Sequence, residues 1–155
     1  MSFTLRNNVT AITIREMQPG DRPAWAAMRH ALWPKEAVQA YGSEIDAILK
    51  DKDAWGFAAE EAGKLVGFAE LSIRKAANGC ESQPVPFLEG IWVQPEWRRR
   101  GVGKLLITYI EAFLKALGFR ELGSDSLIEN QVSHDTHKAW GFSETERVVY
   151  FRKPL

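Results

Sequence analysis

Residues 93–104 read VQPEWRRRGVGK and join an apolar segment to the longest amphipathic segment of the chain. After this stretch, apolar residues recur at helical spacing from Val102 to Leu117, and Gly118 stands where a helix C-cap belongs. Before it, the apolar run from Phe87 to Val93 is typical of a strand. A strand, a glycine turn and a helix in succession predict an α/β layer fold.

The turn itself has the chemistry of an anion site. A helix start leaves its first N–H groups unpaired, and the helix dipole adds partial positive charge there. Gly101 and Gly103 would let a ligand approach the backbone closely. The stretch therefore predicts a cradle for a pyrophosphate. A dinucleotide fold would need a third glycine and a P-loop would need Gly-Lys-Ser/Thr, and Gly103-Lys104-Leu105 supplies neither.

Further from the turn, the chain alternates between strand and helix patterns. Turn-forming glycines and prolines separate these segments. The predicted strands are residues 11–17, 55–60, 65–74, 87–93, 120–124 and 147–151, and the predicted helices begin after Asp21, at Ser43, at Val102 and at Gln131. Residues 76–86 are poor in apolar side chains and predict a loop long enough to take part in binding.

Composition narrows the classes of partner. The chain has 155 residues, with 20 basic and 20 acidic side chains, so its formal net charge is zero. A neutral chain has no overall field for nucleic acid or an anionic membrane, and we expect neither as a partner. The start of the chain lacks a signal-like pattern and Cys80 is the single cysteine, so we expect a cytoplasmic protein of one domain, residues 1–155.

The pattern Arg98-x-x-Gly101-x-Gly103, after a strand and before a long helix, resembles the coenzyme A signature of the GCN5-related N-acetyltransferases (GNAT). The resemblance implies one N-acetyltransferase domain with a mixed, mostly antiparallel twisted sheet flanked by helices. It also implies acetyl-CoA as co-substrate and no metal. The cofactor-binding residues that it implies are Ile91, Trp92, Val93, Arg99, Arg100, Gly101, Val102, Gly103, Lys104 and Asn130.

Shorter motifs spaced over residues 32–152 narrow the resemblance. They include Leu32-Trp33-Pro34, Ser72-Ile73-Arg74, Asn78-Gly79-Cys80, residues 84–93, Ser124-Asp125, Glu129-Asn130 and residues 141–147. Together they resemble the aminoglycoside 6'-N-acetyltransferases of the shorter, dimeric branch. The resemblance implies direct acetyl transfer to the 6'-amino group in a ternary complex, antibiotic resistance and a homodimer.

Glu89 and Asp125 are the predicted catalytic residues. Glu89 interrupts the apolar strand 85–93, where an inward carboxylate costs several kcal/mol unless it has a partner or a role. Its predicted role is to bind the amine and act as general base, directly or through water; the alternative is an outward side chain satisfied by solvent. Asp125 follows the strand expected beside Glu89, so both could face one cleft.

An aminoglycoside is a polycation, and a neutral protein binds one by clustering carboxylates. The predicted substrate-binding residues are Trp33, Glu36, Glu89, Asp125 and Glu146. Trp33 could form an apolar wall for a sugar ring or could belong to the core, and the glutamates could be solvated surface charges. Where related enzymes carry a substrate-contacting tyrosine, this chain has Ala76-Ala77.

Several alternatives stay open. The acceptor could be another amine, such as a polyamine or a protein amine, and the chain could be a non-catalytic acyl-CoA-binding module. His137 stands where many relatives place a tyrosine that protonates the leaving thiolate, so it could be the general acid or a surface residue. The run His134-Asp135-x-His137 could suggest a metal, but lacks a further defined ligand.

Overall fold

The computed structural model describes residues 3–7, 10–35 and 37–155, with side chains from residue 11 onward. Six strands form one sheet in the order β1-β2-β3-β4-β5-β6. They are β1 (Phe3–Asn7), β2 (Thr10–Glu16), β3 (Ala54–Glu61), β4 (Lys64–Arg74), β5 (Val85–Val93) and β6 (Gly123–Ser124). All neighbouring strands are antiparallel except β5 and β6, which are parallel. The expected mixed, mostly antiparallel sheet is confirmed.

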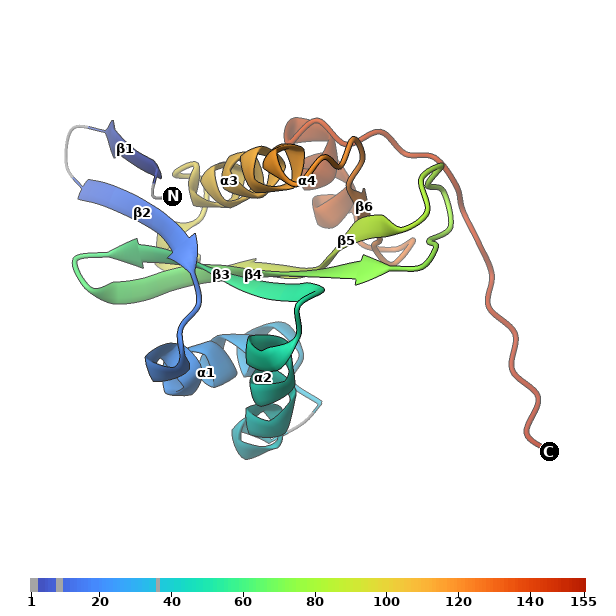
Figure 1. Ribbon diagram of the computed structural model, residues 1–155, viewed down its shortest axis with the longest axis horizontal. Helices are drawn as coiled ribbons and strands as arrows, with labels where there is room; N and C mark the ends of the chain where they lie inside the picture. Colours follow the sequence, from blue (N-terminus) through green and yellow to red (C-terminus); the bar gives the residue numbers. More distant parts are fainter. Residues whose placement is uncertain (1–2, 8–9, 36) are drawn as a thin grey trace.

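Helices cover both faces of this sheet (Figure 1). They are α1 (Arg22–Leu32), α2 (Tyr41–Lys50), α3 (Val102–Ala116) and α4 (Gln131–Ala139). The α3 face buries an apolar cluster that includes Phe57, Leu106 and Ile110. The α1 and α2 face buries a second cluster around Trp25 and Phe68. No helix in the described part of the chain is long and apolar enough to cross a membrane.

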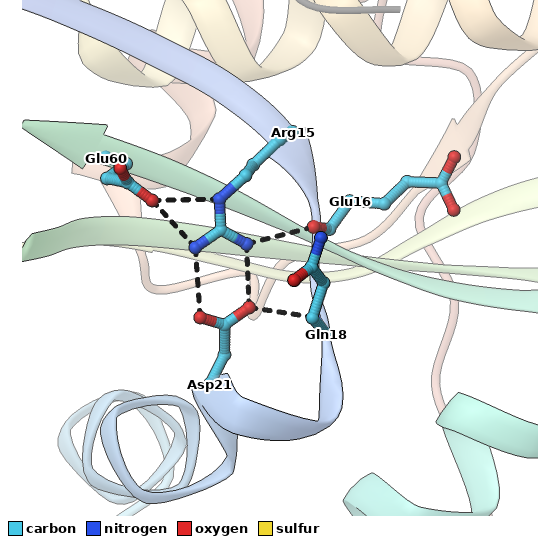
Figure 2. Close-up of polar contacts among 5 residues, drawn as sticks. All are labelled: Arg15, Glu16, Gln18, Asp21 and Glu60. Atoms are coloured by element: carbon cyan, nitrogen blue, oxygen red, sulfur yellow. Dashed lines mark hydrogen bonds and ion pairs between the residues drawn. The ribbon is translucent and has the colours of Figure 1, made fainter. Parts of the chain in front are cut away.

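A polar cluster joins the start of α1 to the sheet (Figure 2). Arg15 on β2 donates to both carboxylate oxygens of Asp21 at 2.7 and 3.0 Å and to Glu60 on β3 at 2.8 Å. Asp21 also accepts from the Gln18 amide at 2.8 Å. Asp21 stands at the N-cap position of α1 but makes no capping bond to the helix. The helix begins after Asp21 as predicted, but the oxygens of Asp21 bind Arg15 and the preceding turn instead of the first amides of α1.

Three element predictions need correction. The strand β1 lies in a segment for which the sequence analysis expected no element. Of the strand expected over residues 120–124, only Gly123 and Ser124 pair, because β6 meets β5 over just two positions. The strand expected over residues 147–151 is absent: residues 142–155 form an irregular segment that leaves the body of the molecule (Figure 1). An apolar segment forms a strand only beside a partner strand, and among the described residues this segment has none.

Candidate active site

The turn between β5 and α3 has the backbone features of an anion site. Gly101 is the N-cap of α3 with φ 84°, a conformation that favours glycine. The first helical bond of α3 runs from the Leu105 amide to the Gly101 carbonyl, so the amides of Val102, Gly103 and Lys104 have no partner within the helix. A Cβ added at Gly101 would meet no heavy atom within 4 Å, so the space before the helix is open. These features fit a diphosphate.

The two glycines of the turn differ in role. A Cβ added at Gly103 would lie 2.5 Å from Cζ2 of Trp140, just after α4. Gly103 is therefore small because α4 packs on it, and the expectation that it opens the backbone to ligand applies to Gly101. The sequence offered no way to foresee the contact, because Trp140 is 37 positions later.

The three arginines of the turn make different contacts. Arg98 Nε donates to the Val93 carbonyl at 2.9 Å, so this side chain binds the last carbonyl group of β5. Arg100 lies over the Trp97 ring at 5.3 Å. Arg99 is exposed and has φ 60°. Arg99 and Arg100 are both at the surface before α3, where their charge adds to that of the open amides.

Strand β5 diverges from β6 beside Glu89. Their parallel ladder pairs Phe87 with Gly123 and Leu88 with Ser124, and goes no further. From Glu89 to Val93, β5 therefore has no β6 neighbour. This stretch contains Ile91, Trp92 and Val93, the residues expected to line the thioester arm of acetyl-CoA. Among the described residues, this edge of β5 has no strand partner from Glu89 to the turn that follows Val93.

Glu89 is the extra residue of a β-bulge. Glu70 on β4 pairs with Gly90 and Leu71 pairs with Leu88, so Glu89 has no partner in the register. A bulge redirects a side chain that strand alternation would otherwise place. The bulge brings the Glu89 carboxylate to Ser72 and Arg74 of β4. The alternative of a solvent-satisfied side chain does not hold, because protein donors bind both carboxylate oxygens.

Three donors hold that carboxylate. Oε1 accepts from Ser72 Oγ at 2.5 Å and from Arg74 Nε at 2.8 Å, and Oε2 accepts from Arg74 Nη2 at 2.6 Å. Partial burial raises the pKa of Glu89, but the hydrogen bonds from Arg74 and Ser72 and the charge of Arg74 outweigh it and lower the pKa below its usual value. Glu89 is therefore ionised at neutral pH.

Trp33 lies next to this cluster. A Cβ on Gly90 would lie 2.6 Å from Cη2 and Cζ2 of Trp33, so the indole covers the backbone directly after Glu89. Trp33 is half-buried and packs edge-on against Phe68, with ring centroids 6.3 Å apart. The Tyr41 hydroxyl donates to the Trp33 carbonyl. The core interpretation of Trp33 is supported by its packing on Phe68, and its role as a wall for a sugar ring stays a prediction.

The acidic residues predicted to bind substrate do not all lie near Glu89. Asp125 is exposed and lies close enough to Arg74 to raise the pKa of that arginine, so it shares the Glu89 region. Glu146 is exposed beside Gly79 of the loop between β4 and β5. No contact recorded for the described residues brings Glu146 or Glu129 to Glu89. Glu36 lies outside the described residues.

The remaining candidates have defined partners. Asn130 Oδ1 accepts from the Ser133 amide at 3.1 Å and so caps α4. His137 Nε2 lies 2.8 Å from Ser124 Oγ, and Nδ1 lies 2.7 Å from the Ser133 carbonyl. The histidine is half-buried rather than free on a helix surface. Within residues 3–7, 10–35 and 37–155, no three His, Cys, Asp or Glu side chains form a group that could hold a metal ion.

Cys80 lines a hollow between α3, α4 and the loop between β4 and β5. Burial raises the pKa of its thiol, and the nearby Glu121 carboxylate raises it further. A protonated thiol is a poor nucleophile, so Cys80 does not fit covalent catalysis. The hollow has a volume of about 400 Å³ and is lined by residues 78–80, 119–124 and 140–143, with parts of α3.

Sequence reasoning missed Arg74 and Ser72 as partners of Glu89. The motif Ser72-Ile73-Arg74 carried a signal, since two polar side chains alternate with an apolar one at the end of a strand. It also missed the buried pair Arg29 and Glu70, whose signal is a charged residue inside an apolar run.

Comparisons with known proteins agree with this geometry. Residues 16–142 match the family model described as acetyltransferase (GNAT) family. An aminoglycoside N(6')-acetyltransferase type 1 from Stenotrophomonas maltophilia is 47% identical over 148 residues, covering 94% of this chain and 95% of the relative. A protein of the same name from Salmonella enteritidis is 42% identical, covering 90% of this chain and 97% of the relative.

Solved structures give the same result. Aminoglycoside N-acetyltransferase AAC(6')-Iy in complex with CoA has a TM-score of 0.90 and 39% identity, covering 97% of this chain and 100% of its own. The same enzyme with the bisubstrate analogue CoA-S-monomethyl-acetylneamine has a TM-score of 0.87 and 41% identity, covering 93% and 99% of the two chains. The chain described here therefore belongs to the acetyltransferase (GNAT) family and, within it, to the aminoglycoside N(6')-acetyltransferases.

Proposed function

We propose that this chain transfers the acetyl group of acetyl-CoA to the 6'-amino group of an aminoglycoside antibiotic, by direct attack in a ternary complex, and so confers resistance. The observation that carries the proposal is an ionised, protein-bound Glu89 at the point where β5 and β6 diverge, on the strand that leads to the open amides of α3. Relatives with this name at 42–47% identity support the acceptor class.

Acetyl-CoA would lie along β5 and the turn. Backbone amides of Arg99 to Lys104 would hold the diphosphate, and the unpaired edge of Ile91 to Val93 would line the thioester arm. The co-substrate supplies an activated acyl group, so the protein needs no nucleophile of its own. Asn130, at the start of α4, would contact the co-substrate in addition to capping its helix.

The acceptor would lie between Glu89 and Trp33. Glu89 and Asp125 would attract the ammonium groups and orient one nitrogen for attack, and Trp33 would cover a sugar ring. We also propose that the carboxylates of Glu146 and Glu36 help to attract the polycationic acceptor. Over one turnover the acceptor nitrogen loses two protons: the departing thiolate takes one and solvent takes the other by way of Glu89.

Two further features belong to the proposal. We infer a homodimer, because the apolar residues of the C-terminal segment are exposed and β6, an edge strand, offers a pairing partner in a second copy. We also place the enzyme in the cytoplasm, where acetyl-CoA is a common metabolite.

A turnover assay with acetyl-CoA tests the function. The amine panel is kanamycin, amikacin, gentamicin, spermidine and a lysine peptide. We expect release of CoA with the aminoglycosides and little with spermidine or the peptide. Preferred turnover of spermidine or the peptide would reject the acceptor class, and no turnover with any amine would reject the acetyltransferase itself.

Replacement of Glu89 tests the mechanism. Glu89→Gln keeps the size of the side chain and removes its charge, so we expect transfer to slow by about 10²-fold or more. Acetyl-CoA affinity, measured by calorimetry, should stay unchanged because the turn is at the other end of β5. A wild-type rate for the variant would remove Glu89 from the mechanism.

A further inference from the structure

Arg74 has no role in the chemistry described so far, yet it makes the closest contacts of the Glu89 carboxylate together with Ser72. The guanidinium binds both oxygens, through Nε to Oε1 and through Nη2 to Oε2. It also lies over the Phe87 ring, 3.5 Å from its centroid. The Phe87 ring packs against one face of the guanidinium group, and the Glu89 carboxylate accepts hydrogen bonds from its edge. These two contacts together fix the orientation of Arg74.

The hydrogen bonds leave one oxygen of Glu89 incompletely bound. An ionised carboxylate has about four acceptor positions, two on each oxygen. Oε1 accepts from both Ser72 and Arg74, and its two positions are filled. Among the described residues, Oε2 accepts one recorded bond, from Arg74. The carboxylate thus presents one open position, and that position is on Oε2.

We propose that Arg74, assisted by Ser72, is a positioning residue for acetyl transfer, which turns the Glu89 carboxylate so that Oε2 receives the acceptor nitrogen or the water bound to it. The proposal rests on the function proposed above for Glu89. It adds a specific atom that receives the proton and a second side chain on which the rate depends.

The protons and electron pairs of the proposed transfer can be followed from Oε2. The acceptor enters as an ammonium and gives one proton to Oε2, which converts the pair into a neutral amine and a carboxylic acid. The nitrogen lone pair then forms a bond to the acetyl carbon, and the carbon–sulfur bond breaks with its electron pair leaving on sulfur. Glu89 returns its proton to solvent, and the second nitrogen proton goes to the thiolate.

The charged surroundings of the cluster set the pH dependence. Arg74 on β4 is the cation that faces Glu89, and Asp125 after β6 and Tyr150 in the C-terminal segment face Arg74 in turn. Partial burial alone raises the pKa of Glu89, whereas Arg74 and Ser72 lower it. Without Arg74, burial remains, so Glu89 would gain its proton at a higher pH and lose its function as pH falls.

The test compares Arg74→Gln with the wild-type protein by kcat/KM for an aminoglycoside from pH 5.5 to pH 8. The ratio of the two proteins at each pH cancels the titration of the acceptor. We expect kcat/KM of the variant to be about tenfold lower than that of the wild-type protein at pH 8. We also expect the ratio to fall further toward pH 5.5, because Glu89 without Arg74 gains its proton at a higher pH. A ratio that stays near one at every pH would overturn the proposal.

Two variants serve as controls. Arg74→Lys keeps the positive charge but loses the two-bond geometry, so its ratio should stay flat with pH while kcat falls. Arg15→Gln breaks a comparable two-bond arginine pair with Asp21 (Figure 2). Arg15 is on β2, which β3 and β4 separate from β5 in the sheet. It should leave the pH profile unchanged. An equal pH effect in Arg15→Gln would show that loss of stability, rather than positioning, causes the result for Arg74→Gln.

The outcome for Glu89→Gln separates the two claims. If Glu89→Gln is slow and the Arg74→Gln ratio stays near one at every pH, the positioning role alone is rejected. If Glu89→Gln turns over at the wild-type rate, the proposed role of Glu89 is rejected as well.

Discussion

At the scale of single residues, backbone geometry decides what each side chain can do. Glu89 reaches Arg74 because one extra residue bulges from β5, and Gly103 is small because Trp140 packs on it. Both effects depend on which atoms meet across elements. A larger side chain at position 103 therefore changes how α4 packs on the turn.

Gly103→Ala tests the packing of α4 on the turn. The added methyl group would lie 2.5 Å from the Trp140 ring, so the tryptophan has to move. We expect the free energy of unfolding, measured in urea, to fall by about 1–3 kcal/mol. Gly42→Ala in α2 is the matched control, since a Cβ there meets nothing within 4 Å and a helical alanine should stabilise by about 0.5–1 kcal/mol. Equal effects of the two substitutions would contradict the packing role.

At the scale of elements, buried and exposed charges fix how helices and loops attach to the sheet. Arg29 on α1 is 7% exposed and Glu70 on β4 is 4% exposed. Arg29 Nε lies 2.8 Å from Glu70 Oε1, and Trp25 Nε1 donates to the same oxygen at 2.7 Å. Arg29 also lies over the rings of Trp33 and Tyr41. This pair holds α1, and with it Trp33, against the sheet.

Removing one partner of the buried pair should be costly. Arg29→Met leaves the Glu70 carboxylate buried without its cation, and we expect the free energy of unfolding to fall by about 3–5 kcal/mol. Arg22→Met, which breaks the exposed pair of α1 with Asp46, should change it by less than about 1 kcal/mol. Urea unfolding of both variants measures the difference, and a small effect of Arg29→Met would show that α1 does not depend on this pair.

Glu121 attaches the loop between β4 and β5 to the segment before β6. Its carboxylate accepts from the amides of Glu81 and Ser82 at 2.8 Å each and from the Ser82 hydroxyl at 2.6 Å. These bonds lower the pKa of Glu121 to about 2. Because the pKa is lowered on folding, the stabilisation is complete above the ordinary carboxyl pKa of 4.5 and is lost as pH falls toward 2.

Glu121→Gln should release this loop at neutral pH. A neutral amide accepts weaker bonds than a carboxylate, so we expect faster amide hydrogen exchange at Glu81 and Ser82. Glu129→Gln changes an exposed glutamate in another loop; it is the control and should leave exchange at these two amides unchanged. Unaltered exchange in Glu121→Gln would mean that other contacts hold the loop.

At the scale of the whole molecule, the C-terminal segment leaves the body of the chain (Figure 1). Val149, Tyr150 and Phe151 are 77%, 80% and 93% exposed, which is unusual for three consecutive apolar side chains. Such a segment gains most by pairing with a strand edge in a second copy. The proposed homodimer would account for residues 147–151, which have the pattern of a strand but pair with no strand among the described residues.

Truncation of the segment tests the homodimer. Deletion of residues 148–155 removes the apolar side chains, and we expect the protein to change from dimer to monomer in sedimentation. Deletion of residues 152–155 alone keeps them and should keep the dimer. A full-length protein that sediments as a monomer would contradict the arrangement.

The sequence predicted the elements that have strong local patterns. It failed for elements and contacts that depend on residues far away in the sequence. Residues 102–117 gave nearly the bounds of α3, because apolar spacing and Gly118 act within the helix. Glu89 could be singled out as a carboxylate in an apolar strand. Its pairing with Arg74 could not, because that contact depends on strand register and on the bulge. The segment 147–151 failed for the same reason, since pairing needs a partner strand.

The central claim is that Glu89 serves the transfer of an acetyl group to the 6' nitrogen of an aminoglycoside. The most direct test measures CoA release with two aminoglycosides that differ only in an amino or a hydroxyl group at the 6' carbon, in wild-type protein and in Glu89→Gln. The account predicts turnover of the 6'-amino compound alone, reduced about 10²-fold or more in the variant. Equal turnover of the two compounds, or a variant as fast as the wild-type protein, would contradict it.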